Sequence, residues 1–326
     1  MRLSPSDRGA TISENGSVSA LRIVFAGSPM AAVPSLDALI ESRHEVVAVV
    51  SREDSPVGRK RVLTPTPVAA RAADAGIDRI LADRLTPDVG EQIAALTPDL
   101  GVIVAYGGLV REPLLSAPRL GWINLHFSLL PRWRGAAPVQ HAIMAGDERT
   151  GVNVFQLVPE LDAGPVFAER AEPIGRFQTS GALLERLAVL GATTLVDVVD
   201  ALADGTAVAV EQTGTPTLAP KLNSADGVIS WQEEAIMIDR RIRAVTPEPG
   251  ASTTLDGERF KVLAAAIAHH EAPMAPGSVA ASAGRILVGT ADTPLELLRV
   301  QPAGKSAMDA AAWWRGRQSS ESTVLA

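Results

Sequence analysis

The sequence predicts an α/β fold, with a mostly parallel sheet and helices on both of its faces, followed by a smaller β-rich domain. Three observations support this prediction. Short apolar runs alternate with segments of helical periodicity through the first part of the chain. Several short strand candidates follow one another near the end, as in a small β barrel or sandwich. The length of 326 residues also suits two domains better than one.

The first part of the chain reads as repeated strand and helix units. Apolar runs of strand length predict buried strands at 21–26, 45–50, 100–105, 122–126 and 151–158. Apolar residues at helical spacing predict helices at 33–40, 67–75, 86–96, 139–145 and 179–203. This alternation favours parallel neighbours, because parallel strands need a crossover connection between them.

A second domain is predicted after a break in this pattern. Thr213-Gly-Thr-Pro-Thr217 and Pro220 are typical of a linker. Beyond it we expect a helix at 234–244 and strands at 251–254, 259–264, 285–288 and 295–300. We therefore divide the chain into a disordered N-terminal extension (1–20), an α/β domain (21–212), a linker (213–226) and a C-terminal β-barrel domain (227–326).

Composition excludes several classes of protein. The net charge of −7 argues against a general nucleic-acid coat protein. Because the chain has no cysteine, it has no disulfide, thiolate nucleophile, iron–sulfur cluster or cysteine-type zinc site. The first twenty residues lack the apolar core of a secretory signal. The longest apolar stretch, 100–110, is shorter than the roughly 20 residues of a membrane helix. We expect a soluble, cytoplasmic protein.

The turn after the first strand lacks the usual signature of a dinucleotide cofactor. That signature is G-x-G-x-x-G, whereas Gly27 is followed by Ser28 and Pro29. Pro29 has no N–H to offer to a pyrophosphate. A nicotinamide-dependent oxidoreductase is therefore a weaker alternative. A ligand can still bind beyond the carboxyl ends of the strands.

Two polar residues near the end of one predicted strand are candidates for catalysis. Asn124 and His126 are two positions apart, so both side chains project to the same face. An amide can donate a hydrogen bond to a developing oxyanion, and an imidazole can exchange protons near neutral pH. Asp162, in the loop Pro159-Glu-Leu-Asp-Ala-Gly-Pro165, could orient His126. Together they suit an acyl-type transfer; the alternatives are a structural histidine and an ordinary turn aspartate.

Two basic segments are candidates for contact with an anionic partner. Arg59, Lys60 and Arg61 lie in the loop from Val57 to Pro67 and favour phosphate contact. Arg132 and Arg134 flank Trp133, and the three could stack on and pair with an anion. The alternatives are a solvated loop and a surface loop with one buried tryptophan.

These motifs together resemble the methionyl-tRNA formyltransferases, a branch of the 10-formyltetrahydrofolate-dependent formyltransferase family. The resemblance lies in Asn124-x-His126 followed by Ser128-Leu-Leu-Pro-Arg-Trp-Arg-Gly-Ala-Ala-Pro138. It extends to the loop Leu161-Asp-Ala-Gly164, to Ala219-Pro-Lys-Leu222 and to Gln301-Pro-Ala-Gly-Lys305, and so covers nearly the whole chain after residue 20. It implies a Rossmann-like formyltransferase domain and a C-terminal barrel of the oligonucleotide-binding kind.

The resemblance also implies substrates and roles. The reaction would transfer the formyl group of 10-formyltetrahydrofolate to the amino group of methionine on initiator tRNA, for translation initiation, with no metal. The catalytic residues would be Asn124, His126 and Asp162. The residues that line the folate site would be Ser128, Leu129, Leu130 and Pro131. The residues that contact tRNA would be Arg59, Lys60, Arg61, Arg132 and Arg134. We further expect a monomer.

Other acceptors and other activities remain open from the sequence alone. An enzyme of the same fold could formylate an amino-sugar nucleotide, and the basic loop at 57–67 argues against that reading. A catalytically inactive RNA-binding protein is a further alternative. The intact set of Asn124, His126 and Asp162 argues against it.

Overall fold

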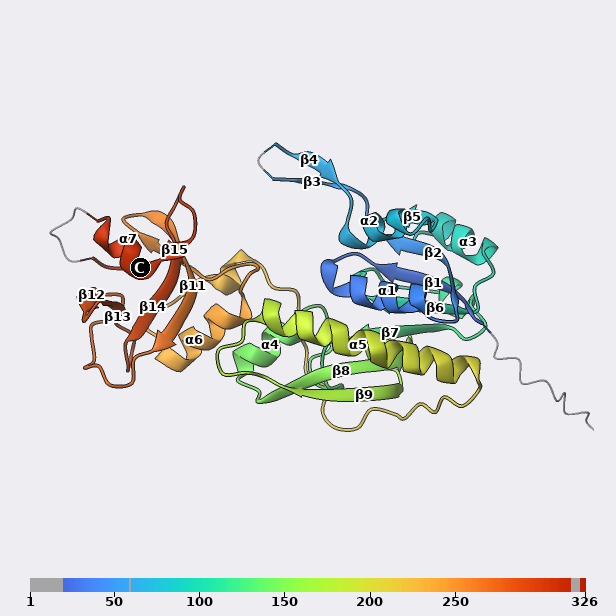
Figure 1. Ribbon diagram of the computed structural model, residues 1–326. Coiled ribbons are helices and arrows are strands. Elements are labelled where there is room, and N and C mark those ends of the chain that lie inside the picture. The colour runs from blue at the N-terminus through green and yellow to red at the C-terminus, as the bar shows by residue number, and fades with distance from the viewer. Residues whose placement is uncertain (1–19, 59, 318–322) are drawn as a thin grey trace, which may run out of the picture.

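The computed structural model describes residues 20–58, 60–317 and 323–326. Apart from Ala20, the N-terminal extension expected at 1–20 lies outside the described residues. Figure 1 shows an α/β domain joined to a smaller β-rich domain. The predicted fold class is confirmed.

A single mixed sheet forms the centre of the first domain, with strand order β5-β2-β1-β6-β7-β8-β9. Its strands are β1 (Arg22–Gly27), β2 (Glu45–Ser51), β5 (Arg79–Leu81), β6 (Leu100–Val104), β7 (Trp122–His126), β8 (Arg149–Gln156) and β9 (Val166–Pro173). The strands from β5 to β7 are parallel, and β8 and β9 continue the sheet in antiparallel fashion. The order reverses direction between β1 and β6, at the kind of position where open α/β sheets bind ligands.

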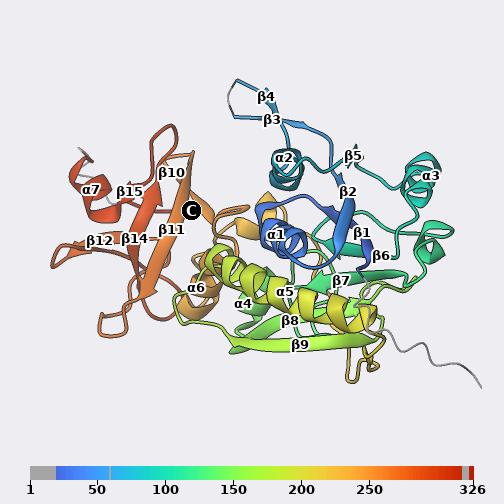
Figure 2. The ribbon, with the colours of Figure 1, turned by 45° about the vertical axis from the view of Figure 1, so that its right-hand side comes forward.

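Helices cover both faces of this sheet (Figure 2). They are α1 (Val33–Glu41), α2 (Pro67–Asp74), α3 (Pro87–Ala95), α4 (Pro138–Ala145) and α5 (Ser180–Ala203). Alternate residues of β1 serve the two faces: Ile23 and Phe25 pack in the cluster formed with α1 and α5, whereas Val24 and Ala26 pack in the cluster formed with α3. The apolar strands are therefore buried on both sides, as their continuous hydrophobic runs predicted.

The second domain is an antiparallel sheet wrapped around its own core. Its elements are α6 (Ala235–Ala244), β10 (Ser252–Leu255), β11 (Glu258–Ile267), β12 (Val279–Ser282), β13 (Arg285–Val288), β14 (Leu295–Gln301), β15 (Met308–Asp309) and α7 (Ala310–Arg315). Strand order is β10-β11-β14-β13-β12, and β15 pairs with β14. Leu325 forms a bridge to Leu255 and Val324 forms one to Ser278, so the end of the chain spans the two sheet edges.

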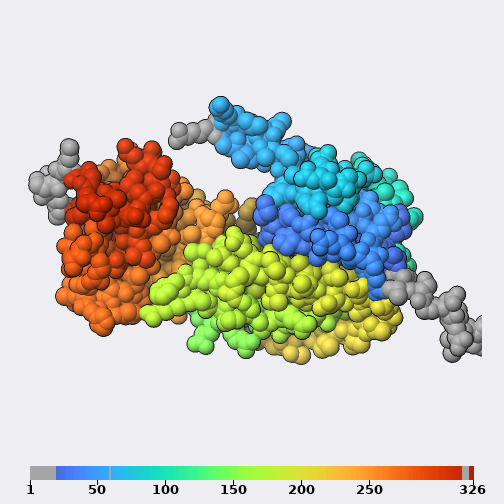
Figure 3. Space-filling model, in the orientation of Figure 1, coloured from blue at the N-terminus to red at the C-terminus, as the bar shows by residue number. Residues whose placement is uncertain are grey.

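The basic segment after β2 is a hairpin rather than the irregular loop that its two prolines suggested. β3 (Ser55–Val57) pairs with β4 (Val62–Thr64), and both strands are exposed. The hairpin projects from the α/β domain, and Figure 3 shows a hollow between it and the second domain. β2 and β7 run parallel, so their carboxyl ends lie on the same side of the sheet. The hairpin follows the carboxyl end of β2, and His126 lies at the carboxyl end of β7.

Besides the hairpin strands β3 and β4, the described residues form four strands that were not predicted: β5, β9, β12 and the two-residue β15. β5 has only three residues, and β12 begins the short hairpin to β13. β9 lies at the edge of the sheet and carries Glu169, Arg170 and Glu172, which are exposed or half-buried. Charged residues protect an edge strand from pairing with another chain, but they also remove its apolar signal.

The two domains contact each other through α4, α5 and α6. Met144 of α4 packs against the core of the second domain, and Ala244 of α6 packs in the core of the first. The Ser180 hydroxyl and the Gly181 N–H, at the start of α5, both donate to the Thr246 carbonyl at 2.9 and 3.1 Å. These contacts join the first turn of the longest helix to the end of α6.

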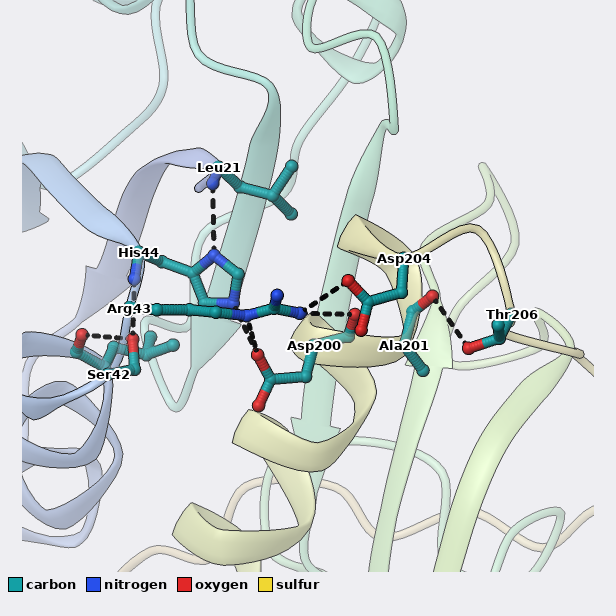
Figure 4. Close-up of polar contacts among 9 residues, drawn as sticks. Leu21, Ser42, Arg43, His44, Asp200, Ala201, Asp204 and Thr206 are labelled. Carbon is teal, nitrogen blue, oxygen red and sulfur yellow. Dashed lines mark hydrogen bonds and ion pairs between the residues drawn. The ribbon is translucent and has the colours of Figure 1, made fainter. Parts of the chain in front are cut away.

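A polar cluster ties the start of the sheet to the end of α5 (Figure 4). His44 is buried, and its Nδ1 accepts a hydrogen bond from the Leu21 N–H at 3.1 Å. Its Nε2 therefore carries the proton and donates to Asp200 at 3.1 Å. Arg43 pairs with Asp200 and with Asp204. The cluster serves the architecture, because it lies away from the carboxyl ends of the parallel strands.

Within the ranges 20–58, 60–317 and 323–326, the structure has no helix long and apolar enough to cross a membrane.

Alanine substitutions at two glycines, one between β6 and β7 and one in α3, should change stability in opposite directions. Gly101 pairs with Trp122, and a Cβ at Gly101 would overlap the indole ring of that fully buried tryptophan. Gly101→Ala should lower the free energy of unfolding by about 3 kcal/mol. Gly90 lies in α3, where an added Cβ would meet Leu114 at an ordinary 3.8 Å. Gly90→Ala should raise stability by about 0.5–1 kcal/mol. Urea denaturation of both variants tests this, and an unchanged midpoint for Gly101→Ala would contradict it.

Candidate active site

The two polar residues of β7 lie at the edge of the sheet where the parallel strands end. Ile123 and Leu125 pack in the core beneath α1 and α5, so strand alternation turns Asn124 and His126 to the opposite face. His126 pairs in register with Asn153 of β8. Asn124 is half-buried, and its side chain makes no hydrogen bond to any residue that the structure describes. Its amide is therefore free to donate to a ligand.

His126 is held in one orientation by the loop that follows β7. Only 6% of the residue is exposed. Its Nε2 lies 2.8 Å from the carbonyl oxygen of Trp133, which can only accept, so Nε2 carries the proton of the neutral ring. The other ring nitrogen, Nδ1, lies 3.8 Å from Oδ2 of Asp162. In the neutral tautomer Nδ1 is thus the basic atom of the site, and it faces a carboxylate.

Burial sets the protonation state of His126. Removal of the ring from water lowers the pKa of His126 below its ordinary value of 6.5. The negative charge of Asp162 and the Trp133 carbonyl both act to raise that pKa, and burial outweighs them. The imidazole is consequently neutral near neutral pH. It can accept a proton at Nδ1 and hold the resulting cation beside Asp162.

Asp162 reaches His126 from the loop between β8 and β9. Its backbone is in the left-handed region with φ of 46°, and the residue is buried. Oδ2 accepts a hydrogen bond from the Gly135 N–H at 2.7 Å. The distance to Nδ1 exceeds that of a hydrogen bond, so the carboxylate acts on His126 through its charge. The structure therefore brings Asp162 to His126, on the face of β7 that Asn124 shares.

The segment Ser128 to Pro131 forms a turn beside these residues. The Ser128 hydroxyl donates to the Arg132 carbonyl at 2.6 Å, and the Leu130 N–H donates to Oδ1 of Asn153 at 3.0 Å. Ser128 and Leu130 are buried, whereas Leu129 and Pro131 are half-buried. These two hydrogen bonds fix the conformation of the turn and hold it against β8.

The two arginines around Trp133 are engaged within the protein. Arg132 forms two hydrogen bonds to Asp147 and lies 4.5 Å from the centre of the Trp133 ring. The Trp133 indole also donates to Asp147, at 2.7 Å. Arg134 donates to Oε1 of Gln212 at 2.6 Å. Their assignment to tRNA stays a prediction.

The basic residues of the hairpin are only partly described. Lys60 and Arg61 occupy its turn and are exposed. Arg59 lies outside the described residues. Lys60 and Arg61 follow β2, and β2 ends at the same side of the sheet as β7, which carries His126.

Several residues that shape the site were not predicted from the sequence to do so. Gln212 contacts both Arg134 and the Asp162 loop. Asp147 holds Trp133. Ala219 bonds to the loop after β7: its N–H donates to the Arg134 carbonyl, and its carbonyl accepts from the Ala137 N–H. Spacing could not find these residues, because their partners are distant in sequence. Among the described residues there is no group of three or more histidine, aspartate or glutamate side chains able to hold a metal ion.

Comparison with known proteins places the chain in a family. Residues 21–199 match the family model described as "Formyl transferase", and residues 221–318 match "Formyl transferase, C-terminal domain". Among solved structures, the sugar 3N-formyl transferase WlaRD aligns with a TM-score of 0.65 at 16% identity, over 88% of this chain and 100% of that one. The N-formyltransferase from Helicobacter canadensis aligns with a TM-score of 0.62 at 15% identity, over 86% and 99%. At such identity these likenesses concern the fold.

Curated relatives are much more similar in sequence. The methionyl-tRNA formyltransferase of Clavibacter sepedonicus is 58% identical over 91% of this chain and 97% of its own length. That of Leifsonia xyli subsp. xyli is 58% identical over the same shares. That of Thermobifida fusca is 50% identical over 91% and 96%. These matches run through both domains. The chain therefore belongs to the formyl transferase family, within its methionyl-tRNA formyltransferase branch.

Proposed function

We propose that this protein transfers the formyl group of 10-formyltetrahydrofolate to the α-amino group of methionine on initiator tRNA, in the cytoplasm, for translation initiation. The observation that carries the proposal is the likeness to methionyl-tRNA formyltransferases across both domains, at 58% identity over 91% of the chain. An amino-sugar acceptor has weaker support, since the solved structures described as sugar formyltransferases, or solved with an amino-sugar nucleotide, share 15–21% identity.

Asn124 would stabilise the negative charge that develops on the formyl oxygen. Attack of the amine on the formyl carbon forms a new C–N bond and leaves a tetrahedral carbon with an oxyanion. The Asn124 amide has no partner among the described residues and lies at the sheet edge where the strands end. A pre-positioned donor of this kind favours the charged transition state.

His126 and Asp162 would handle the protons. The attacking nitrogen must lose a proton, and the folate N10 must gain one as its bond to the formyl carbon breaks. Neutral His126 can accept the first proton at Nδ1, because Nε2 is committed to the Trp133 carbonyl. Asp162, at 3.8 Å, then faces the imidazolium with opposite charge. Burial makes that cation short-lived, which favours delivery of the proton to N10.

The folate would lie against the turn from Ser128 to Pro131. Within this turn, the half-buried Leu129 and Pro131 are available for contact, whereas Ser128 and Leu130 support the shape. Apolar side chains at these two positions suit contact with the face of a flat ring system. No metal is required in this scheme, since the amide and the imidazole supply the charge stabilisation and the proton transfers.

The tRNA would bind across the hollow between the hairpin and the second domain (Figure 3). Arg59, Lys60 and Arg61 of the basic segment 57–67 would contact the phosphates near the aminoacylated end. Exposed Val57, Val62 and Leu63 on the same hairpin offer apolar surface for contact with bases. Arg132 and Arg134 would contact the tRNA through the guanidinium N–H groups that are not bonded to Asp147 and Gln212. A monomer suffices for this arrangement, because both domains come from one chain.

The first test is formylation of methionyl-initiator tRNA with 10-formyltetrahydrofolate, compared with His126→Ala. The wild type should form formylmethionyl-tRNA, and the variant should lose about 10²–10⁴-fold in kcat because the proton acceptor at Nδ1 is gone. An amino-sugar nucleotide serves as the alternative acceptor. Turnover of the sugar nucleotide without turnover of the tRNA would assign the same chemistry to a different acceptor.

The hairpin predicts a selective effect on tRNA. Replacement of Arg59, Lys60 and Arg61 together by alanine should raise the KM for tRNA by about 10-fold or more, because three phosphate contacts are lost. The KM for the folate should change less than about 2-fold, since the hairpin is separate from the turn at 128–131. A matched control removes the same charge elsewhere on the domain, by alanine at the exposed Arg79, Arg84 and Arg111. Equal losses for both substrates, or for both triple variants, would contradict the role of the hairpin.

The depressed pKa of His126 predicts a pH dependence of stability that needs no substrate. Below about pH 6.5 the unfolded chain binds a proton at this histidine while the folded protein does not. As the pH is lowered below about 6.5, the free energy of unfolding should therefore decrease, and it should decrease more steeply in the wild type than in His126→Gln. Urea denaturation at a series of pH values measures this difference. Parallel curves through that range would contradict the buried, neutral state of His126.

A further inference from the structure

Gln212 uses its whole side-chain amide to join two loops of the active site. Its Oε1 accepts from Arg134, at 2.6 Å from Nη2 and 3.2 Å from Nε. Its Nε2 donates to the carbonyl oxygens of Asp162 at 2.8 Å and Gly164 at 2.9 Å. One side of the amide thus holds the loop after β7, and the other side holds the loop that carries Asp162.

Asp162 is a residue that needs such support. Its φ of 46° is unfavourable for a residue with a Cβ, so the surrounding contacts must impose it. One anchor is the Gly135 N–H, which holds the carboxylate at 2.7 Å. The second is Gln212, which holds the main chain of the same residue. Loss of the second anchor would let the backbone relax and move the carboxylate relative to Nδ1 of His126.

We propose that Gln212 is a positioning residue for the transfer reaction, which holds the Asp162 and Gly164 carbonyls so that the Asp162 carboxylate stays opposite Nδ1 of His126. The effect on turnover rests on the proposed function; the effect on the geometry of the His126–Asp162 pair does not. Gln212 lies where α5 gives way to the segment that leads into the second domain. The connecting segment therefore supplies part of the active site.

The location of Gln212 separates this role from one in overall stability. The residue is half-buried and belongs to none of the hydrophobic clusters. Replacement of its amide by an apolar group of similar length therefore opens no cavity in the core. The expected loss lies in kcat, because a displaced carboxylate impairs the transition state more than substrate binding.

Two variants and a matched control test the proposal by kinetics. Gln212→Met removes every polar contact, and Gln212→Glu keeps an acceptor for Arg134 but cannot donate to the two carbonyls. Each should lower kcat by about 10-fold, with KM for methionyl-tRNA and for 10-formyltetrahydrofolate within about 2-fold. Gln156 provides the control: its Nε2 also donates to two carbonyls, those of Leu120 and Trp122, at 3.4 and 3.0 Å. Gln156→Met should retain kcat within about 2-fold.

A second measurement is independent of activity. Nitrogen-15 spectra of histidine-labelled protein, with the signal of His126 identified by His126→Gln, report the protonation of its ring. Among the described residues, Asp162 is the titratable side chain within ion-pair distance of that ring, and its charge raises the pKa of His126. In Gln212→Met the carboxylate should move away, so His126 should titrate at lower pH than in the wild type.

The outcomes are distinguishable. A lower kcat in both Gln212 variants, with the downward titration shift, supports the proposal. Wild-type kcat in Gln212→Met or Gln212→Glu, an effect confined to KM, or an unchanged titration of His126 would overturn it. If the wild type formylated no acceptor, the proposed function would fail. The titration would still decide whether Gln212 positions Asp162.

Discussion

The hydrogen bond from Nε2 of His126 to the Trp133 carbonyl is the interaction on which the candidate active site depends. A buried histidine has two possible neutral tautomers, and only the loop after β7 selects between them. The carbonyl reaches the ring because Trp133 has a left-handed backbone with φ of 63°. That conformation is maintained from both sides, by the indole bond to Asp147 and by the bond from the Trp133 N–H to the Thr217 hydroxyl. The orientation of the His126 ring therefore depends on residues outside the set of Asn124, His126 and Asp162.

Those supports come largely from the segment that joins the domains. Thr217 and Ala219 pair with the loop after β7 along both sides of Arg134, and Gln212 holds the loop that carries Asp162. Gly135 is required there, since a Cβ would lie 2.7 Å from the Ala219 carbonyl. His141 extends the same arrangement: it stacks on Trp133 and its Nε2 donates to the Pro220 carbonyl at 3.0 Å. The second domain is thus tied to the chemistry through the backbone that leads to it.

The strength of local signals explains which features could be predicted from the sequence. Strands such as β1 and β6 are buried on both faces, so their apolar runs are unmistakable, and helices such as α5 show a clear apolar stripe. β9 escaped prediction because an edge strand carries charge in place of that signal. The pair Asn124 and His126 followed from the two-residue period of a strand. The approach of Asp162, 36 positions away, was expected from the resemblance and not from any spacing rule, and the approach of Gln212 was not expected at all, because sheet order and loop contacts decide both.

The separation of 3.8 Å between Nδ1 and the Asp162 carboxylate is itself informative. In many acid–base pairs the carboxylate bonds directly to the ring and orients it. Here orientation comes from the Trp133 carbonyl, and the Gly135 N–H bonds to the same Oδ2 that faces the ring. The carboxylate is therefore left to act by charge alone, and Nδ1 keeps a lone pair that can accept a proton. Burial opposes the cation and Asp162 favours it, so the two forces leave His126 neutral at rest yet able to carry a proton briefly. A base tuned in this way can accept a proton from one nitrogen and release it to another, which the proposed transfer of a formyl group between two nitrogens requires.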